Sequence, residues 1–525
     1  MRKLLVSLSL AMPMLLGAAE LAGTWKFQPP PNPQAQANPK GPIRQPRETI
    51  YCFKVEGNQF TGTAVRNGGI ADIVNGAIDG SHITFENVDG SGRKTPFKGE
   101  INGEELTIQL TNPPPPNPNA RGGGRGPQGP MVLRKFSGDT EYKLPAELAH
   151  KPLPPFKPIA PNGLAKTPPM GWNSWNKFNR NVDDKGVRGM ADAMVASGMR
   201  DAGYIYVNID DTWEGQRDKD GVLQSNEKFP DMKALADYVH AKGLKFGVYS
   251  DAGARTCQGR PGSNGYEDAD ARQYAAWGVD YLKYDWCNTD GVDPKIAYPT
   301  MRDALKRSGR PIVFSMCEWG RSQPWTWARG VGHLWRTTGD IGPSWQSFVR
   351  LLDQQVDLWK FAGPGGWNDP DMLEVGNGTL TAGENRAHFS LWCLLASPLM
   401  AGNDLREMPP EVRDILLNKE VIAVDQDALG AQGRRIRRDD LGRGSSVEIW
   451  AKKLQDGGYA IAFLNRSPVN TEPAQMAVSW QELGLRYDAE PMVRDIWAKK
   501  DLGRVKGTFT ATVAPHDVVM VRVKE

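Results

Sequence analysis

The residues best suited to catalysis lie in the stretch from Asp280 to Cys287, which reads DYLKYDWC. Leu282, Tyr284 and their neighbours have the composition of a short buried strand, yet the stretch carries Lys283 and its strand ends in Asp285. A buried charge has to be paired or used, because removing it from water is costly. An α/β barrel places its catalytic carboxylates at the carboxyl ends of strands, where eight ends surround one mouth. The stretch therefore predicts a strand end at an active site.

The same kind of strand end recurs along the chain after Thr167. Short apolar runs alternate with amphipathic helical stretches such as Val187 to Asp201 and Asp231 to Lys242. The runs end in Trp172, Asp210 and Asp211, Tyr249, Asp285, Cys317 and Glu318, Arg336, Asp371, and Asn403. From Asp210 onward the ends are spaced as βα units are, except for the short step from Cys317 to Arg336. Eight such ends predict a (β/α)8 barrel, also called a TIM barrel, with these residues around its mouth.

The start of the chain predicts export. Arg2 and Lys3 precede an apolar run from Leu4 to Leu16 and the small residues Gly17 to Ala19, the order found in a cleaved signal peptide at residues 1–19. A buried strand or helix is the alternative for this segment. We expect a secreted or periplasmic protein, and no later apolar run is long enough for membrane insertion.

Residues 20–137 have the pattern of an all-β domain. Short alternating segments are separated by turn residues such as Glu56 to Asn58 and Asn102 to Gly103, which predicts consecutive hairpins in a lipocalin-like barrel or a sandwich. Two low-complexity insertions, Gln28 to Pro46 and Asn112 to Pro130, interrupt it. The domain carries no catalytic constellation, so binding of glycans or surfaces and a simple spacing role both stay open.

Three further segments follow this domain. Residues 138–166 predict a Pro-rich linker, and residues 167–433 the catalytic barrel. Residues 434–525 contain short alternating strands between turns, which predicts an antiparallel β-sandwich domain. The basic run from Arg434 to Arg438 is followed by two Asp, and we interpret it as a solvated linker.

Composition narrows the class of ligand. Lys plus Arg total 64 against 61 for Asp plus Glu, a net charge of +3 that is too balanced for nucleic acid or an anionic membrane surface as partner. A neutral ligand fits better. The five cysteines are too few and too widely spaced for a zinc cluster or a disulfide scaffold. None of the six His stands at a strand end beside other metal ligands, so we expect no metal.

Seven blocks of unusual composition lie in order between Thr167 and Leu373. They are TPPMGWNSWN (Thr167 to Asn176), YVNIDDTW (Tyr206 to Trp213), VYSDAGARTC (Val248 to Cys257), DYLKYDWC, FSMCEWG (Phe314 to Gly320), WRTTGDI (Trp335 to Ile341) and GPGGWNDPDML (Gly363 to Leu373). These blocks resemble the α-galactosidases of glycoside hydrolase family twenty-seven, also called melibiases. The resemblance continues more loosely to the C-terminus and covers about two thirds of the chain, without the first β-domain. It implies a retaining exo-glycosidase that removes terminal α-galactosyl residues from oligosaccharides or polysaccharides without a cofactor.

The resemblance also implies the catalytic roles. Asp285 would be the nucleophile that forms a covalent galactosyl intermediate, and Asp340 the acid that protonates the leaving oxygen and then the base that activates water. Lys283 lies two residues before Asp285 on the same strand face, where it would keep Asp285 ionised. From the residues alone, a helix cap in a turn is the alternative for Asp340.

Other mouth residues are implied to bind the sugar. Asp210 and Asp211 match the pair that accepts hydrogen bonds from the galactose O4 and O6 hydroxyls. Both can reach the sugar only where the strand ends and the chain turns, since neighbours on a strand face opposite ways; without the resemblance, one of them could cap the next element. The remaining residues are Trp175 against the apolar sugar face, Tyr249 beside the nucleophile, Lys283 at the hydroxyls, and Arg336 and Asp371 near C2 and C3.

The choice of sugar depends on the C2 side of the pocket. The resemblance implies that Cys317, Glu318 and Trp319 close this side, which smaller residues open in α-N-acetylgalactosaminidases. A β-L-arabinopyranoside is the nearest alternative substrate, because that sugar is galactose without C6. A barrel that binds glycans without hydrolysing them is an alternative of another class. Trp286 departs from the family pattern, and an indole there would line the leaving-group subsite.

The cysteines complete the expected site. The resemblance implies a disulfide between Cys257 and Cys287, which would hold the loop that follows Asp285 and is compatible with export. Cys317 and Cys393 sit in apolar runs, and we interpret both as buried free thiols.

Overall fold

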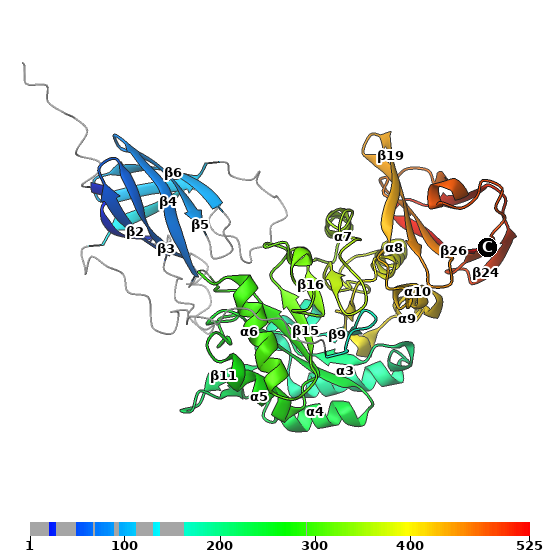
Figure 1. Ribbon diagram of the computed structural model, residues 1–525, viewed down its shortest axis with the longest axis horizontal. Coiled ribbons are helices and arrows are strands. Elements are labelled where there is room, and N and C mark those ends of the chain that lie inside the picture. The colour runs from blue at the N-terminus through cyan, green and yellow to red at the C-terminus, as the bar shows by residue number, and fades with distance from the viewer. Residues whose placement is uncertain are drawn as a thin grey trace, which may run out of the picture. The chain divides into compact units, whose positions relative to one another are not determined.

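The computed structural model describes residues 20–27, 49–66, 69–88, 94–111, 130–136, 162–289 and 291–525, without the side chains of residues 65–70 (Figure 1). The predicted signal peptide, the insertion at 28–46, nearly all of the insertion at 112–130 and most of the predicted linker lie outside these residues. The chain divides into two compact units. One comprises Met1–Lys151 with Asn288–Asp293, and the other Pro152–Cys287 with Pro294–Glu525.

The first unit is a closed barrel of eight antiparallel strands in sequence order, with β1 paired to β8. The strands are β1 (Gly23–Phe27), β2 (Thr49–Glu56), β3 (Gln59–Arg66), β4 (Gly69–Asp79), β5 (His82–Val88), β6 (Lys94–Asn102), β7 (Glu105–Leu110) and β8 (Met131–Lys135). Buried and exposed residues alternate along β5, as expected for a strand with one face in the core. The up-and-down barrel is confirmed, and the sandwich alternative is wrong.

Aromatic side chains fill the interior of this barrel. The ring of Phe85 lies 5.8 Å from that of Phe60 and 5.3 Å from that of Phe97, and Phe53 lies 5.3 Å from Phe60. All four are at most 3% exposed. Close-packed rings contribute dispersion and buried apolar area, so this interior is a core.

The second unit begins with eight parallel strands arranged in the order β17-β16-β15-β14-β13-β10-β9-β18. They are β9 (Met170–Asn173), β10 (Tyr206–Asn208), β13 (Lys245–Asp251), β14 (Tyr281–Asp285), β15 (Val313–Cys317), β16 (Leu334–Arg336), β17 (Trp367–Asp369) and β18 (Leu399–Ala401). A parallel bridge between Leu373 and Ala401 joins the two edges, and Leu373 N–H donates to Met400 O at 2.8 Å. The predicted (β/α)8 barrel is confirmed, and each predicted run end lies in or just after its strand.

Helices connect most of these strands. They are α2 (Trp175–Phe178), α3 (Asp184–Ala196), α4 (Met232–Ala241), α5 (Glu267–Trp277), α6 (Pro294–Arg307), α7 (Trp345–Asp353), α8 (Ala382–Leu394), α9 (Pro410–Leu416) and α10 (Lys419–Asp425). A short hairpin of β11 (Glu214–Arg217) and β12 (Leu223–Ser225) follows β10. Caps fix the helix starts: Asp183 accepts a hydrogen bond from Gly186 N–H, and Asp231 one from Ala234 N–H. The short step from Cys317 to Arg336 has a simple cause, because only a 3-10 turn, Pro324–Thr326, lies between β15 and β16.

The C-terminal domain consists of two antiparallel sheets, one of six strands and one of two. The strands are β19 (Arg434–Gly442), β20 (Ser445–Lys453), β21 (Tyr459–Asn465), β22 (Ala474–Ser479), β23 (Met492–Asp495), β24 (Lys500–Arg504), β25 (Thr508–Val513) and β26 (Asp517–Lys524). The interpretation of the basic run as a linker is wrong, since it opens β19. There Arg435 and Arg438 lie 3.1 and 3.4 Å from the fully buried carboxylate of Glu448. Their charges are needed to pair a buried anion.

None of the helices in the described ranges is long and apolar enough to cross a membrane.

Candidate active site

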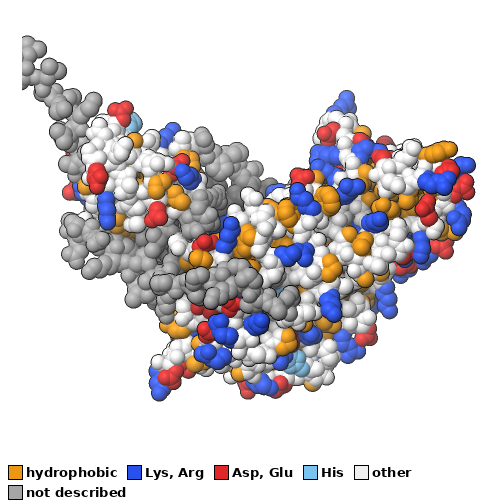
Figure 2. All heavy atoms as spheres, viewed as in Figure 1, with side chains coloured by type: hydrophobic (Ala, Val, Ile, Leu, Met, Phe, Trp, Pro, Cys, Tyr) orange, Lys and Arg blue, Asp and Glu red, His pale blue; other side chains and the backbone are white. Residues whose placement is uncertain are grey.

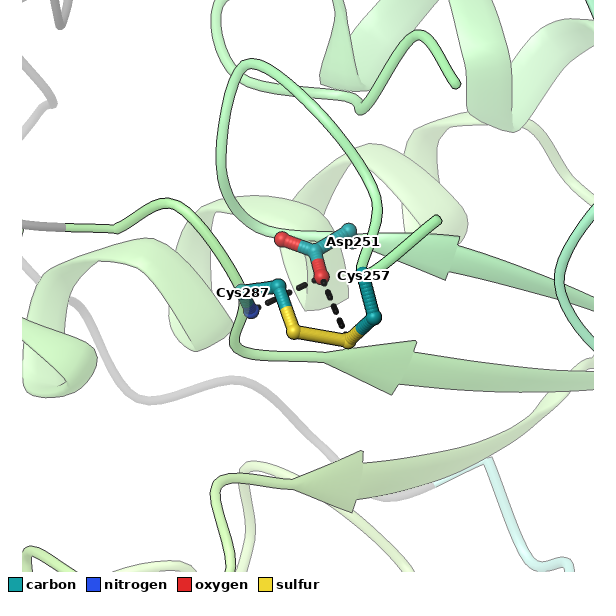
Figure 3. A group of neighbouring side chains, drawn as sticks. All are labelled: Asp251, Cys257 and Cys287. Atoms are coloured by element: carbon teal, nitrogen blue, oxygen red, sulfur yellow. Dashed lines mark hydrogen bonds between the residues drawn. A yellow bond between two sulfur atoms is a disulfide. The ribbon is translucent and has the colours of Figure 1, made fainter. Parts of the chain in front are cut away.

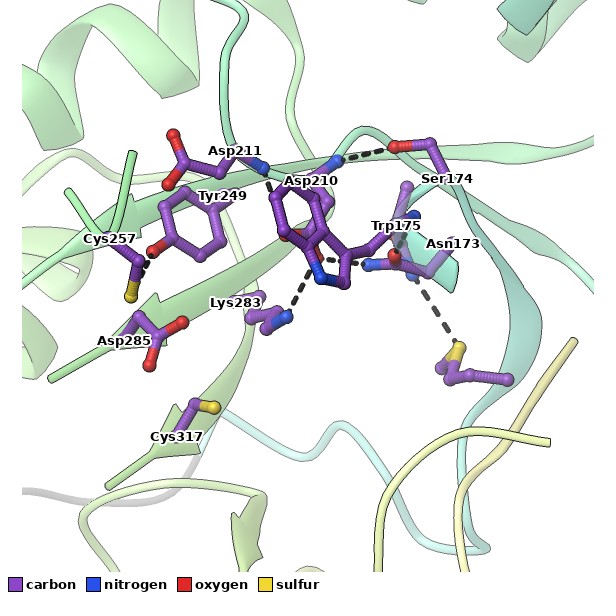
Figure 4. A network of polar contacts seen from close by, with 12 residues as sticks. Asn173, Ser174, Trp175, Asp210, Asp211, Tyr249, Cys257, Lys283, Asp285 and Cys317 are labelled. Carbon is purple, nitrogen blue, oxygen red and sulfur yellow. Dashed lines mark hydrogen bonds and ion pairs between the residues drawn. The ribbon is translucent and has the colours of Figure 1, made fainter. Parts of the chain in front are cut away.

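A cavity of about 270 Å³ lies at the carboxyl ends of the barrel strands. It is lined by Trp175, Asn176, Asn179, Asp210, Asp211, Tyr249, Cys257, Gln258, Lys283, Asp285, Trp319, Arg336, Asp340, Ile341, Pro343, Asp371, Met372 and Glu374. Both predicted catalytic carboxylates are among these residues, as are most of the predicted sugar-binding residues. Figure 4 shows part of this group, which is brought together from strands and loops far apart in the sequence.

Asp285 is the last residue of β14 and is 5% exposed. Its neighbours in register on the adjacent strands are Asp251 and Cys317. One carboxylate oxygen, Oδ1, accepts a hydrogen bond from Trp286 N–H at 2.9 Å. Burial raises the pKa of Asp285 to about 6, with Lys283 lowering it and Asp340 raising it further. At neutral pH most of this carboxyl is therefore ionised, as a nucleophile must be.

Asp340 lies in the loop after β16, and 72% of its side chain is exposed. The Arg336 guanidinium donates to its Oδ1 at 3.1 Å. Enclosure by the cavity raises the pKa of Asp340, but the positive charges of Arg336 and Lys283 outweigh this, so that the pKa falls below its ordinary value. The two carboxyls of the cavity thus have pKa values shifted in opposite directions.

Arg336 connects three parts of the site. It is 4% exposed, and its guanidinium lies 3.0 Å from Asp371 Oδ1 and 3.6 Å from Cys317 Sγ. The other carboxylate oxygen of Asp371 accepts Ile341 N–H at 2.7 Å. Because Ile341 directly follows Asp340, this bond holds the loop that carries the predicted acid.

Asp210 and Asp211 both line the cavity although they are consecutive. Asp210 Oδ2 accepts hydrogen bonds from Lys283 Nζ at 2.7 Å and Asn173 Nδ2 at 2.8 Å, as Figure 4 shows. Burial raises the pKa of Asp211 to about 7, with Thr256 opposing the shift and Asp210 adding to it. These carboxylates form an acceptor-rich wall, which suits a ligand that carries hydroxyl donors.

Three aromatic residues complete the wall. Trp175 is the first residue of α2, and its backbone N–H donates to Asn173 Oδ1 at 2.9 Å. Trp319 has a left-handed backbone with φ of 58°, and the guanidinium carbon of Arg321 lies 4.4 Å from the centre of its ring. The Tyr249 hydroxyl donates to Cys257 Sγ at 3.3 Å, so its hydrogen bond is to the cystine and not to Asp285.

The disulfide between Cys257 and Cys287 is confirmed and joins the loops after β13 and β14 (Figure 3). Beside it lies Asp251, the fully buried last residue of β13. The Asp251 carboxylate accepts Cys287 N–H at 2.8 Å and Gly253 N–H at 2.7 Å. A covalent bond and a buried carboxylate therefore hold the same loop, two residues after Asp285.

Three predicted residues do not line the cavity. Cys317 is a buried free thiol at the end of β15, as is Cys393 within α8. Glu318 is fully buried, and its Oε2 accepts Ser322 N–H at 2.7 Å. Trp286 is 3% exposed and stacks on Tyr298 with ring centres 5.2 Å apart.

Several cavity residues escaped the sequence analysis. They are Asn176, Asn179, Gln258, Ile341, Pro343, Met372 and Glu374. Glu374 accepts hydrogen bonds from Asn176 Nδ2 at 2.6 Å and Asn377 Nδ2 at 2.7 Å, and burial raises its pKa to about 7. Its position just beyond the GWNDPDM block was the only available signal, because its partner from the cavity lining, Asn176, lies 198 residues earlier in the sequence.

Comparison with known families agrees with this geometry. Residues 167–427 match the family model described as alpha galactosidase A, a melibiase model, and residues 444–523 match the alpha galactosidase C-terminal beta sandwich domain. Alpha-galactosidase A of Cellvibrio japonicus is 53% identical over 384 residues, which is 69% of this chain and 92% of that protein. The chain belongs to the melibiase family. The family match covers the barrel and the C-terminal domain in the order in which the structure has them.

Solved structures of the family extend the comparison. A yeast α-galactosidase, from Saccharomyces cerevisiae, determined with raffinose, is 29% identical with a TM-score of 0.64 and covers 70% of this chain and 100% of that chain. A putative α-galactosidase of Bacteroides fragilis is 32% identical with a TM-score of 0.64, covering 90% of this chain and 89% of that chain. The latter coverage extends into the N-terminal unit, since residues 167–525 make up only about two thirds of the chain.

Proposed function

We propose that this melibiase is a retaining exo-α-galactosidase that hydrolyses terminal α-D-galactosyl residues of oligosaccharides or polysaccharides. The observation that carries the proposal is the pair Asp285 and Asp340, two carboxyls that come from different strand ends and line one cavity. Two carboxyls at one site are the usual nucleophile and acid/base pair of retaining glycosidases.

The reaction follows two steps at the anomeric carbon. In the first, an oxygen of Asp285 attacks this carbon while the bond to the leaving oxygen breaks, and that oxygen takes a proton from Asp340. In the second, the Asp340 carboxylate takes a proton from water, whose oxygen attacks the same carbon and displaces Asp285. Two inversions give net retention, and both carboxyls return to their first state.

The proton on Asp340 depends on the bound sugar. In the ligand-free cavity Asp340 is largely exposed and paired with Arg336, which favours the carboxylate. A galactosyl ring in the cavity removes water from around Asp340, and loss of solvation raises the pKa of a carboxyl. Ligand binding thereby moves Asp340 toward the protonated form that donates to the leaving oxygen.

The walls of the cavity favour galactose. Asp210 and Asp211 offer adjacent acceptors for the O4 and O6 hydroxyls, and the indole of Trp175 offers an apolar surface for the ring. Trp319 occupies part of the wall, which leaves less room for a C2 acetamido group. This supports an α-galactoside over an α-N-acetylgalactosaminide.

The relatives support the same substrate class. The Cellvibrio japonicus protein is named an α-galactosidase, and the yeast enzyme was determined with raffinose, a galactose-containing oligosaccharide. A β-L-arabinopyranosidase or a non-hydrolytic glycan-binding protein is less well supported. Support for an α-galactosidase comes from Asp210 and Asp211 as candidate acceptors for O6, and from the two carboxyls Asp285 and Asp340 in the lining of one cavity.

Two further parts of the proposal concern the rest of the chain. We propose export through the signal peptide at residues 1–19, which accords with a disulfide in the barrel. Glycan or surface binding by the N-terminal barrel stays a prediction. Because its interior is a packed aromatic core, such a ligand would have to bind on the outside.

The test is hydrolysis of three aryl glycosides by the full chain: the α-galactoside, the α-N-acetylgalactosaminide and the β-L-arabinopyranoside. We expect turnover of the α-galactoside above both others, with NMR showing the α-anomer as the first product. If only the arabinopyranoside reacts, the carboxylates keep their roles and the O6 contact is wrong. No turnover of any of the three by folded protein would support a binding protein.

A further inference from the structure

A buried carboxyl group lies just outside the cavity, at Glu214. It is the first residue of β11 and is fully buried. Its Oε2 accepts Thr212 N–H at 3.0 Å, while its Oε1 has no hydrogen-bonding partner within the described residues. Burial raises the pKa of Glu214 well above its ordinary value, with the nearby Asp211 adding to the shift. A half-satisfied buried carboxyl is costly, and a leucine of similar size would avoid that cost.

The residue that Glu214 binds has an unusual backbone. Thr212 has φ of 88°, a conformation that β-branched residues rarely adopt. Its N–H is held by Glu214, and its carbonyl oxygen accepts Asn226 Nδ2 at 2.7 Å. Two buried side chains from outside the cavity thus hold Thr212 from both sides.

The turn at Thr212 bears directly on the pair Asp210 and Asp211. In a continuing strand these neighbours would point to opposite faces, yet both line the cavity. The chain leaves β10 at Asn208 and turns at Thr212, directly after Asp211. The carboxylate of Asp211 then accepts Thr256 Oγ1 and Gln258 N–H, both at 2.9 Å. The strained turn at Thr212 therefore directly follows the residue whose carboxylate is held in the cavity lining.

We propose that Glu214 is a positioning residue for sugar recognition, which acts by holding Thr212 N–H so that Asp211 faces the bound ring. Glu214 lies outside the cavity lining, so the proposal gives it no contact with the sugar. The inference rests on the proposed function in one respect, since it takes the ligand of Asp211 to be a galactosyl hydroxyl. It assigns to Glu214 the role of a hydrogen-bond acceptor, not of a charge.

The test compares Glu214→Gln with Glu214→Leu in the full chain. Glutamine keeps a carbonyl oxygen that can accept Thr212 N–H, whereas leucine has a similar size and no acceptor. The measurements are the Kd of D-galactose by calorimetry, kcat and KM for the aryl α-galactoside, and Tm. For Glu214→Gln we expect Kd, kcat and KM within about threefold of their wild-type values. For Glu214→Leu we expect Kd and KM to rise about tenfold with a smaller change in kcat, because ground-state binding is lost.

Asp425→Asn is the matched control. Asp425 is also fully buried with an unpartnered Oδ1 among the described residues, and it lies in α10, outside the cavity lining. This variant should lower Tm and leave the Kd of galactose and KM unchanged. Should Glu214→Leu fail to fold, Asn226→Ala loosens the same turn from its carbonyl side and should raise Kd and KM in the same direction.

Two results would overturn the proposal. One is a Glu214→Leu protein with lower Tm and wild-type Kd and KM, which would make Glu214 merely structural. The other is a Glu214→Gln protein as impaired in binding as Glu214→Leu, which would show that the acceptor is not what matters. Failure of the proposed function is a separate result, since it would appear as wild-type protein that binds galactose without cleaving the α-galactoside.

Discussion

The molecule contains two eight-stranded barrels that differ in strand direction and in what their side chains form. In the N-terminal barrel the strands are antiparallel and the interior is packed with aromatic rings such as those of Phe60 and Phe85. In the second barrel the strands are parallel, and a cavity lined by carboxylates, Lys283 and Arg336 lies at their carboxyl ends.

Strand direction explains the difference. In an antiparallel barrel neighbouring strands end on opposite rims, so polar strand ends are divided between two sides. Eight parallel strands all end on one rim, which brings residues such as Asp285, Cys317 and Arg336 together from distant positions in the sequence. Parallel strands therefore gather their polar ends into one cavity, whereas antiparallel strands divide them between two rims.

The sharpest test of this contrast is Asp285→Asn in the parallel barrel. An amide cannot form the covalent galactosyl ester, so kcat for the aryl α-galactoside should fall by on the order of 10⁴-fold or more. Asp280→Asn is the matched control in the same stretch, because Asp280 pairs with His240 and Arg310 outside the cavity lining. Residual activity of Asp285→Asn near the wild-type level would place the nucleophile elsewhere.

Asp340→Asn should have the next largest effect and should also change the pH dependence. Without the acid, turnover of an oligosaccharide should fall about 10²- to 10⁴-fold. α-Galactosyl fluoride needs no proton for departure of fluoride, so its first step then reports on Asp285 alone. Its rate should rise with pH as Asp285 ionises.

The pKa shifts also predict the direction in which Asp340→Asn moves the pH midpoint of that rise. Asp340 contributes to the raised pKa of Asp285, about 6 in the wild type, because two negative charges in one cavity disfavour each other. Removing the charge of Asp340 should therefore move the midpoint below pH 6, as measured by the fluoride burst at a series of pH values. An upward movement would contradict the assigned coupling of the two carboxyls.

Phe85→Ala makes the converse test in the antiparallel barrel. Phe85 is 2% exposed between Phe60 and Phe97, so truncation should cost that unit about 3–5 kcal/mol of unfolding free energy. Calorimetry of the full chain should show a lower unfolding temperature for this unit, while kcat/KM for the aryl α-galactoside stays as in wild type. Val132→Ala, at a 42% exposed position, is the control and should cost less than about 0.5 kcal/mol.

The smallest effect is expected from removing the N-terminal barrel. A chain that begins at residue 162 retains every residue of the cavity lining, so its kcat/KM for the aryl α-galactoside should stay within about twofold of the full chain. A loss of tenfold or more on this small substrate would assign the N-terminal unit a part in catalysis and weaken the contrast between the two barrels.

Much of the fold followed from local patterns. Apolar runs with polar ends located all eight strands of the catalytic barrel, and hairpin turns such as Asn102 to Gly103 located the N-terminal strands. Local patterns did not choose between a barrel and a sandwich for the N-terminal domain, because that depends on whether β1 pairs with β8. They also misassigned the run at Arg434, whose pairing with buried Glu448 is a contact between strands.

The sequence by itself determined the order of strands and helices, the family, and the residues whose types could act as nucleophile, acid and acceptors. Only the tertiary structure decided which of these share one cavity. It left Glu318 outside the lining, brought in Glu374, and placed Glu214 beneath the turn at Thr212. The physical reason is that strand and helix patterns are properties of neighbours in the chain, whereas burial, charge pairing and cavity shape arise between segments far apart in it.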